Sequence, residues 1–281
     1  MKSISRQTAL SAFGAVGGAT LLTGCGDVGL LTSVAEGKPP AKQKPRPSAT
    51  DPTTLGPSLP TATHNWKYVE LEAAEVADRA YRIYPDGGCM YAVVGSVVTA
   101  LSDKVGEPFR SFPINMMRYG DGGVGAWGSL CGVVNGGSAL IGLFHNEQAK
   151  TTRGELIVEL CVWYESSALP QYAPSQPEWA DKAKPSIAGS LLCHVSTAQW
   201  CKNAECGAFT MEKKERCRRL AADGAAKVVG ILNRASINES DFVELSAEVN
   251  ACIDCHGPKD KGDAMGKMNR STCHQFDGKH P

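Results

Sequence analysis

Apolar residues recur every three to four positions in two long stretches of the chain, and this spacing is typical of amphipathic helices. The first stretch spans 66–83 and contains Trp66, Val69, Ala73, Val76, Ala77, Ala80 and Ile83. The second spans 211–232 and carries on one face Cys217, Leu220, Ala221, Ala225, Val228 and Ile231. Two long helices of this kind predict a mainly α fold.

The segments between these helices are less regular. The sequence Tyr84-Pro85-Asp86-Gly87-Gly88 predicts a break after the first helix. Residues 89–101 are apolar on all sides, and their small side chains favour a buried helix over a pair of buried strands. Residues 120–142 are rich in glycine, which allows backbones to approach closely. Residues 155–164 fit either a strand or a helix.

The first 24 residues have the layout of an export signal. Lys2 and Arg6 precede an apolar run that is shorter than the about 20 residues a membrane-spanning helix needs. The run ends in Leu-Thr-Gly-Cys25, which is similar to a bacterial lipobox and would make Cys25 the lipid-attachment residue; an ordinary cleavage site nearby is the alternative. We therefore expect an exported, periplasmic protein with a membrane anchor.

A stretch rich in Pro, Thr, Ser and Lys follows, from Lys38 to Pro60. Such a composition does not bury enough apolar surface to fold, and it favours an extended, solvated chain. We expect residues 1–24 to be the cleaved signal peptide and residues 25–62 to form a disordered tether between the lipid anchor and a folded part that starts near residue 63.

Charge and cysteine content narrow the function classes. The chain has 29 basic and 29 acidic residues, so it lacks the basic excess that phosphate contacts require, and we expect no nucleic-acid partner. Its 11 cysteines are more than a routine cytosolic enzyme carries. They indicate disulfides, a metal centre or a covalently attached cofactor.

The most specific motif is Cys252-Ile253-Asp254-Cys255-His256. Two thiols three residues apart can add to both vinyl groups of one haem, and a histidine directly after the second thiol can reach the iron. Ser240 or Asp241 is a candidate N-cap for a helix that leads into this motif. We expect covalent c-type haem attachment through Cys252 and Cys255, with His256 as an axial ligand.

Two other interpretations of this motif remain open. A thioredoxin-like dithiol opens a helix after a strand, whereas this motif closes a helical stretch. A zinc site needs four ligands, and beyond Cys273 the fourth would have to be His274 or His280.

Cys273-His274 also has the ending of a second haem motif, but Arg270 stands where its first cysteine would be.

Several separated segments resemble a known family. Residues 88–95 (GCMYAVVG) and 122–132 (GGVGAWGSLCG) are similar to the redox-active family named for its C-GCAxxG-C-C cysteines. Residues 192–196 (LCHVS), Trp200-Cys201, Arg216-Cys217 and the haem motif resemble the split-Soret cytochromes c within it. The resemblance spans about residues 65–281.

The resemblance implies a helical, exported, dimeric electron carrier with two c-type haems near the C-terminus of each subunit. It implies histidine ligation on both faces of each haem and haems stacked at the dimer interface. Residues 266–274 (GKMNRSTCH) are similar to the second attachment segment, so Cys273 and His274 are expected to hold a second haem, whose double tether Arg270 puts in question. The folded part then divides into a helical C-GCAxxG-C-C-type domain at 63–235 and a haem-binding segment at 236–281.

Histidine ligation on both faces requires distal ligands for the haems. His194 lies in the family-like LCHVS segment and is the first candidate, acting within the chain or across the dimer; His280 is the second. His145 is also explained as a hydrogen-bonded residue of the folded domain, and His64 as an exposed residue at the edge of the tether. Met265 and Met268 are further candidates that packing explains equally well.

Seven cysteines lie outside the haem motifs and Cys25. Cys89, Cys131, Cys201 and Cys217 carry the family resemblance, with Cys193 and Cys206 close behind, and the family associates an iron–sulfur centre with cysteines of this domain. An iron–sulfur cluster such as [2Fe–2S] takes four thiolates. Disulfides are the alternative in an exported protein, and Cys161 fits a buried thiol.

No arrangement typical of an enzyme stands out: the sequence has no recognisable nucleophile motif, carboxylate pair or phosphate-binding loop. We therefore expect an electron carrier that exchanges electrons with redox partner proteins, rather than an enzyme. A haem reductase or peroxidase with an open iron position, and a lipid-anchored zinc-binding adaptor, are the alternatives.

Overall fold

The computed structural model describes residues 66–145, 149–175, 183–241, 243–256 and 266–269. The chain divides into two compact units, 1–59 and 60–281, and all described residues belong to the second. The predicted signal peptide, Cys25 and the predicted tether lie outside the described residues. The elements are α1 (Ala73–Val105), η2 (Phe109–Ser111), η3 (Ile114–Gly120), α2 (Gly132–Phe144), α3 (Arg153–Ser166), β1 (Ala168–Leu169), β2 (Ser186–Ile187), α4 (Cys193–Ala204), α5 (Met211–Ser236) and α6 (Ala247–His256).

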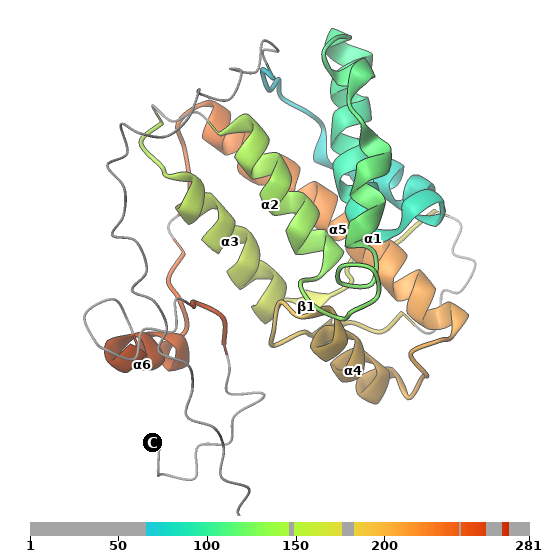
Figure 1. Ribbon diagram of the computed structural model, residues 1–281, viewed down its shortest axis with the longest axis vertical. Coiled ribbons are helices and arrows are strands. Elements are labelled where there is room, and N and C mark those ends of the chain that lie inside the picture. The colour runs from blue at the N-terminus through green and yellow to red at the C-terminus, as the bar shows by residue number, and fades with distance from the viewer. Residues whose placement is uncertain (1–65, 146–148, 176–182, 242, 257–265, 270–281) are drawn as a thin grey trace, which may run out of the picture. The chain divides into compact units, whose positions relative to one another are not determined.

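The predicted mainly α class is confirmed. Helices α1, α2 and α5 pack on one another, and α2 lies between α1 and α3 (Figure 1). The two-residue strands β1 and β2 form the antiparallel sheet of this part, with Ala168 opposite Ile187 and Leu169 opposite Ser186. None of the helices in the described ranges combines the length and the apolar character needed to cross a bilayer.

Helix α1 begins later than its apolar pattern predicted. It starts at Ala73, and residues 66–72 are not helical. Trp66 instead packs edge-on against Phe109 and Phe112, with ring centroids 5.4 and 5.7 Å apart. The start predicted at Trp66 is wrong because these apolar side chains reach the core from a non-helical segment.

The predicted break in α1 is a kink at one residue, Gly88. The helix continues past Pro85, and Gly88 alone has non-helical angles, with φ at 78°. Because this backbone region favours glycine, Gly88 can turn the chain where another residue would be strained. The segment after the kink is the predicted buried helix, and its first residue is Cys89.

Glycines allow α2 to pack closely against its neighbours, as the sequence predicted. A Cβ atom on Gly137 would lie 2.6 Å from Leu160 Cδ2 and 2.7 Å from Val228 Cγ2. A Cβ atom on Gly132 would lie 2.7 Å from the Gly120 carbonyl oxygen. Real Cβ atoms do not make such contacts, so these positions require glycine for the observed spacing of α2, α3 and α5.

Residues 155–164 are helical and lie within α3. Thr152 caps this helix by accepting a hydrogen bond from the Glu155 backbone N–H, and the Glu155 carboxylate accepts one in return from the Thr152 N–H. This reciprocal capping box satisfies two backbone donors at the start of the helix. It favours the helix over the strand that the apolar pattern also allowed.

Helix α5 is the predicted second amphipathic helix. Thr210 caps it, and its buried face includes Leu220, Ala221, Ala225 and Val228. The last helix, α6, begins at Ala247, later than predicted from Ser240 or Asp241. Ser246 accepts a hydrogen bond from the Val249 N–H, as an N-cap residue does.

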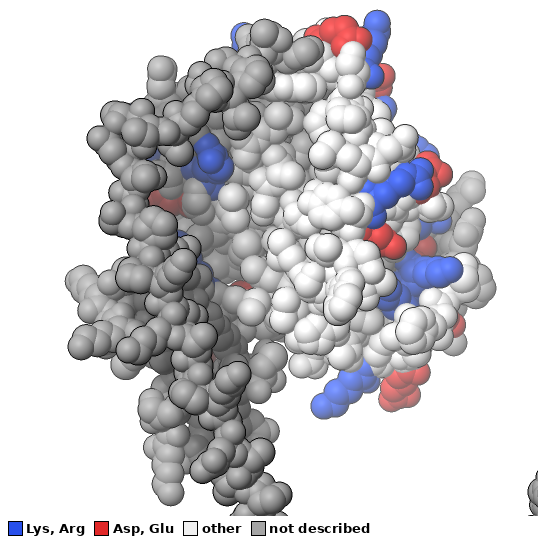
Figure 2. Space-filling model, in the orientation of Figure 1, with Lys and Arg blue, Asp and Glu red and all other residues white. Residues whose placement is uncertain are grey.

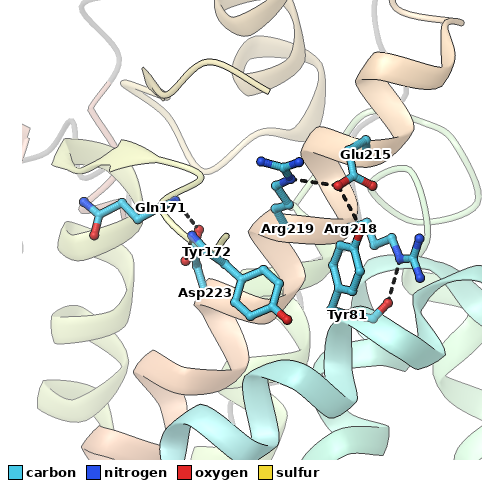
Figure 3. Close-up of polar contacts among 7 residues, drawn as sticks. All are labelled: Tyr81, Gln171, Tyr172, Glu215, Arg218, Arg219 and Asp223. Carbon is cyan, nitrogen blue, oxygen red and sulfur yellow. Dashed lines mark hydrogen bonds and ion pairs between the residues drawn. The ribbon is translucent and has the colours of Figure 1, made fainter. Parts of the chain in front are cut away.

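A polar cluster ties α5 to α1 and to the segment after β1 (Figure 3). Tyr81 and Arg219 both donate to Glu215 Oε1, at 2.9 and 2.7 Å. The Arg218 guanidinium lies 3.8 Å from the centroid of the Tyr81 ring. Asp223 accepts 2.8 Å hydrogen bonds from the backbone N–H groups of Gln171 and Tyr172.

Replacing Asp223 with alanine should lower the free energy of unfolding by about 1–2 kcal/mol, because two backbone donors lose their acceptor. Asp223→Asn keeps one acceptor oxygen and should lose less. Urea unfolding followed by circular dichroism measures both changes. Equal stability of Asp223→Ala and the wild type would show that water replaces the carboxylate at no cost.

Candidate redox site

Four cysteines from four elements gather at the end of the α1–α2–α5 core. Cys89 follows the kink in α1, Cys131 precedes α2, Cys193 begins α4 and Cys217 lies on α5. The side chains of Cys89 and Cys217 are hydrogen-bonded to each other. Cys131 and Cys193 lie within electrostatic range of Cys217. We call these four residues the cysteine cluster.

Glycines permit this gathering. A Cβ atom on Gly132 would lie 2.9 Å from Cys89 Cβ, and one on Gly123 would lie 2.7 Å from Cys193 Cβ. Gly123 also has a φ of 72°, which glycine adopts without strain. The glycine-rich segment therefore brings the backbones of α1, α2 and α4 close enough for their cysteines to meet.

The loop that covers this region has an unusual backbone. All five residues from Gly122 to Ala126 have positive φ, including Val124 at 63° and Ala126 at 66°. Hydrogen bonds hold the loop, among them Ser129 N–H to the Gly123 carbonyl at 3.0 Å. Side chains in this backbone region cost free energy, and such strain is often found at functional sites.

The loop also presents apolar side chains to the surface. Trp127 is 87% exposed, and the neighbouring Tyr119 and Val124 are exposed as well. The face shown in Figure 2 carries an uncharged area over its middle, while charged side chains lie mainly toward its edge.

A buried polar chain links two members of the cysteine cluster. Arg216, only 2% exposed, points Nη1 at Cys217 Sγ at 3.8 Å and donates through Nη2 to Ser196 Oγ at 2.7 Å. The Tyr164 hydroxyl donates to the same Ser196 oxygen at 3.0 Å and is hydrogen-bonded to the Cys131 thiol. Cys217 and Cys131 are thus connected through Arg216, Ser196 and Tyr164.

This environment gives the four thiols different acidities. The hydrogen bond from Cys89, together with the charges of Arg216 and Lys213, holds the pKa of Cys217 well below its usual range. The same hydrogen bond, with burial, raises the pKa of Cys89. Burial raises the pKa of Cys131, and that of Cys193 to about 11. Because metal ligation requires thiolates, metal binding here would release protons.

His194 lies beside the cluster, exposed at the start of α4. Its Nδ1 lies 2.8 Å from the Gly128 carbonyl oxygen. Since a carbonyl only accepts, Nδ1 carries the hydrogen, and Nε2 keeps its lone pair. This arrangement is typical of histidines that bind metal through one nitrogen while the other is held by the backbone.

The haem-motif residues and the other candidate histidines lie outside the cysteine cluster or outside the described residues. Cys252 is half-buried on α6, whose last turn contains residues 255 and 256. Cys273, His274 and His280 lie outside the described residues. His145 Nε2 is within 3.0 Å of the Thr151 carbonyl oxygen, which agrees with its interpretation as a hydrogen-bonded residue of the domain. Every cysteine of the described part whose side chain is placed is a free thiol, so the alternative of disulfides has no support there.

Comparisons with known proteins show a match to a redox-active family. The family model described as "Putative redox-active protein (C_GCAxxG_C_C)" matches residues 91–231. This stretch begins two residues after Cys89 and contains six cysteines, Cys131, Cys161, Cys193, Cys201, Cys206 and Cys217. A curated relative, "Split-Soret cytochrome c" from Desulfovibrio desulfuricans (strain ATCC 27774 / DSM 6949 / MB), is 33% identical over 218 residues, which cover 74% of this chain and 77% of the relative.

The chain belongs to the C_GCAxxG_C_C family. Its structure is similar to a solved structure described as "A novel iron centre in the split-Soret cytochrome c from Desulfovibrio desulfuricans ATCC 27774". The TM-score is 0.68 at 29% identity, and the match covers 76% of this chain and 94% of the other. The predicted resemblance to this family is confirmed.

The side chains of the cysteine cluster suit an iron–sulfur cluster better than a single metal ion. No group of three or more His, Cys, Asp or Glu side chains among the described residues is arranged to hold a single metal ion. A cluster with several irons spreads its ligands more widely than one ion does. The donor chemistry fits such a cluster, because iron–sulfur clusters are held by thiolates and the buried cation Arg216 lies beside Cys217.

The structure brings together three of the four cysteines named from sequence, Cys89, Cys131 and Cys217, and adds Cys193 to them. Cys201, two turns further along α4, is partly buried like Cys193 and also lies within electrostatic range of Arg216 and Cys217, so it stays a candidate ligand. Trp200, fully buried, marks the inner face of α4. Cys193 is seven residues before it and shares that face, whereas Cys201 does not. This helical spacing is the signal that could have favoured Cys193.

Proposed function

We propose that this protein is an exported c-type cytochrome that transfers electrons through haem bound at Cys252, Cys255 and His256. A second redox centre of iron is held by the cysteine cluster. The observation that carries the proposal is the joint presence of the haem motif and the gathered cysteines in a chain similar to split-Soret cytochrome c. When bound, haem and iron–sulfur groups supply reversible one-electron chemistry.

The haem segment supports the first part of the proposal. Residues 252, 255 and 256 fall within the last turns of α6, so a thiol and the next thiol–histidine pair are one helical turn apart. Cys273 and His274 hold a second haem through a single thioether, because Arg270 replaces the other cysteine. Iron ligation by His274 does not require both thioethers.

His194 is the preferred distal ligand. Its exposed position and its Nδ1–H bond to Gly128 leave Nε2 able to meet an iron from outside the helical core. His280 is the second candidate. An exposed ligand of this kind can also act on a haem of a second copy, which fits the proposed homodimer with stacked haems. A lipid anchor on Cys25 would hold this assembly at the periplasmic face of the membrane, where it meets redox partner proteins.

Carbon monoxide binding separates an electron carrier from an enzyme. If both axial positions are occupied by histidine, the reduced protein should show almost no spectral change under carbon monoxide. Rapid, full conversion to a carbon monoxide adduct in the wild type would contradict the carrier and favour a reductase or peroxidase with an open iron position.

Replacing His194 with alanine should open one iron position and raise the fraction of haem that binds carbon monoxide at least tenfold. His145→Gln is the matched control, because His145 bonds the Thr151 carbonyl in the domain and should leave the haem unchanged. Equal behaviour of the two variants would remove His194 from the list of ligands.

A further inference from the structure

Arg216 is a buried cation whose bonding differs from that of two other arginines of α5, the buried Arg219 and the half-buried Arg234. Arg219 pairs with Glu215 at 2.7 Å, and Arg234 pairs with both Glu159 and Asp241. Figure 3 shows Arg219 and Glu215 on the side of α5 that faces Tyr81. Within the described ranges Arg216 has no carboxylate partner, and its hydrogen bonds go to Cys217 and Ser196.

A buried guanidinium needs a compensating negative charge. Removing a cation from water costs several kcal/mol unless an anion or a set of acceptors faces it. Ser196 is a neutral acceptor, so it does not balance the charge. The group left to do so is the cysteine cluster, because Cys217 Sγ lies 3.8 Å from Nη1. Lys213, one helical turn before Cys217, adds a second cation to the same thiols.

We propose that Arg216 is the positioning residue that balances the charge of the iron centre in the cysteine cluster and raises its reduction potential. The inference rests on the proposed function, since it requires that iron is bound there. One electron from a redox partner protein would turn one Fe(III) of a bound centre into Fe(II), with the partner oxidised by one electron and no bond broken. The added negative charge is stabilised by a fixed cation at short range in a poorly solvated site.

The hydrogen bonds from Arg216 through Ser196 to Tyr164 also fix the position of the guanidinium. They hold the guanidinium through Nη2, while Nη1 faces Cys217, and they reach the thiol of Cys131. Ser196 and Tyr164 are themselves almost fully buried. A fixed guanidinium does not have to reorganise when the electron arrives, which makes its effect on the potential larger than that of a mobile surface charge.

The test is a reductive titration of the purified holoprotein with dithionite and redox mediators, followed by electron paramagnetic resonance for the iron centre and visible absorption for the haem. Arg216→Gln should make reduction of the iron centre at least tenfold less favourable, which is about 59 mV for a one-electron couple. Arg216→Lys keeps the charge and should recover most of the potential. The haem potential should stay unchanged in both variants.

Arg219→Gln is the matched control, because it removes a buried cation from the same helix on the side that faces Tyr81. It should change the equilibrium constant for reduction of the iron centre by less than a factor of two. If Arg216→Gln retains iron and titrates like the wild type, this inference is overturned while the proposed iron centre stands. A wild type without non-haem iron overturns both.

If Arg216→Gln fails to hold iron, the variants Arg216→Lys and Tyr164→Phe show whether the charge of Arg216 or the shape of its guanidinium is needed. Tyr164→Phe keeps the cation and removes only the hydroxyl that holds Ser196 and Cys131. Iron retention in both, with potentials close to the wild type, supports the charge as the essential feature. Loss of iron in Arg216→Lys as complete as in Arg216→Gln would show that guanidinium shape, and not charge, is needed.

Discussion

Replacing Cys217 with serine is expected to reduce the non-haem iron of the purified protein more than tenfold. Cys217 is the member of the cysteine cluster whose pKa is lowered, by its bond from Cys89 and by Arg216 and Lys213, so it is the thiol of the four that is most readily present as the thiolate that iron binds. A serine hydroxyl has similar size but does not replace a soft thiolate ligand of iron. Iron content corrected for haem, together with electron paramagnetic resonance of the reduced protein, measures the loss.

Cys161→Ser is the control, because this half-buried thiol of α3 lies outside the cluster. Its non-haem iron should equal that of the wild type. A Cys217→Ser protein with a full complement of non-haem iron would contradict the placement of the centre.

The pair Cys193→Ser and Cys201→Ser separates the ligand set seen in the structure from the set named from sequence. Cys193 packs against the loop at Gly123 and interacts electrostatically with Cys131 and Cys217, whereas Cys201 lies two turns further along α4 and interacts with Cys217 and Cys206. We expect the first substitution to remove the iron signal and the second to leave it. The opposite result would return Cys201 to the fourth ligand position.

Changing both Cys252 and Cys255 to serine is expected to abolish covalent haem attachment at the first site. A c-type haem is tethered by thioether bonds from these two thiols, and serine does not form them. Haem-stained denaturing gels and intact-protein mass should show the loss of one haem per chain. Cys206→Ser, whose thiol donates to the Ala204 carbonyl in the larger domain, is the control. Unchanged haem mass in the double variant would contradict attachment at this motif.

Periodic apolar residues made the two longest helices readable from sequence. The faces of α1 and α5 bury Val76, Ala80, Leu220 and Val228 as the spacing predicts. The stretch that became α3 was ambiguous because apolar residues cover most of its sides, and the Thr152–Glu155 capping box decides it. Helix α4 was not predicted, since Trp200 and Ser196 are its buried residues and the rest of the helix is polar or partly exposed.

The cysteine cluster shows the limit of sequence reasoning more clearly. Cys89 and Cys217 meet because a kink at Gly88 and the close approach at Gly132 bring distant segments together. Neither the kink angle nor the rotation of α4 is encoded in the spacing of cysteines. Membership of the redox family was predictable from local motifs, whereas the choice of Cys193 and the role of Arg216 needed the packed structure.

A pyridine haemochrome spectrum with haem-to-protein stoichiometry, taken on the purified exported protein, tests the central claim most directly. The account predicts two haems per chain: one with the band of a haem attached by two thioethers, and one with the shifted band of a single thioether at Cys273. A colourless protein without haem would contradict the cytochrome assignment and favour the zinc-binding alternative.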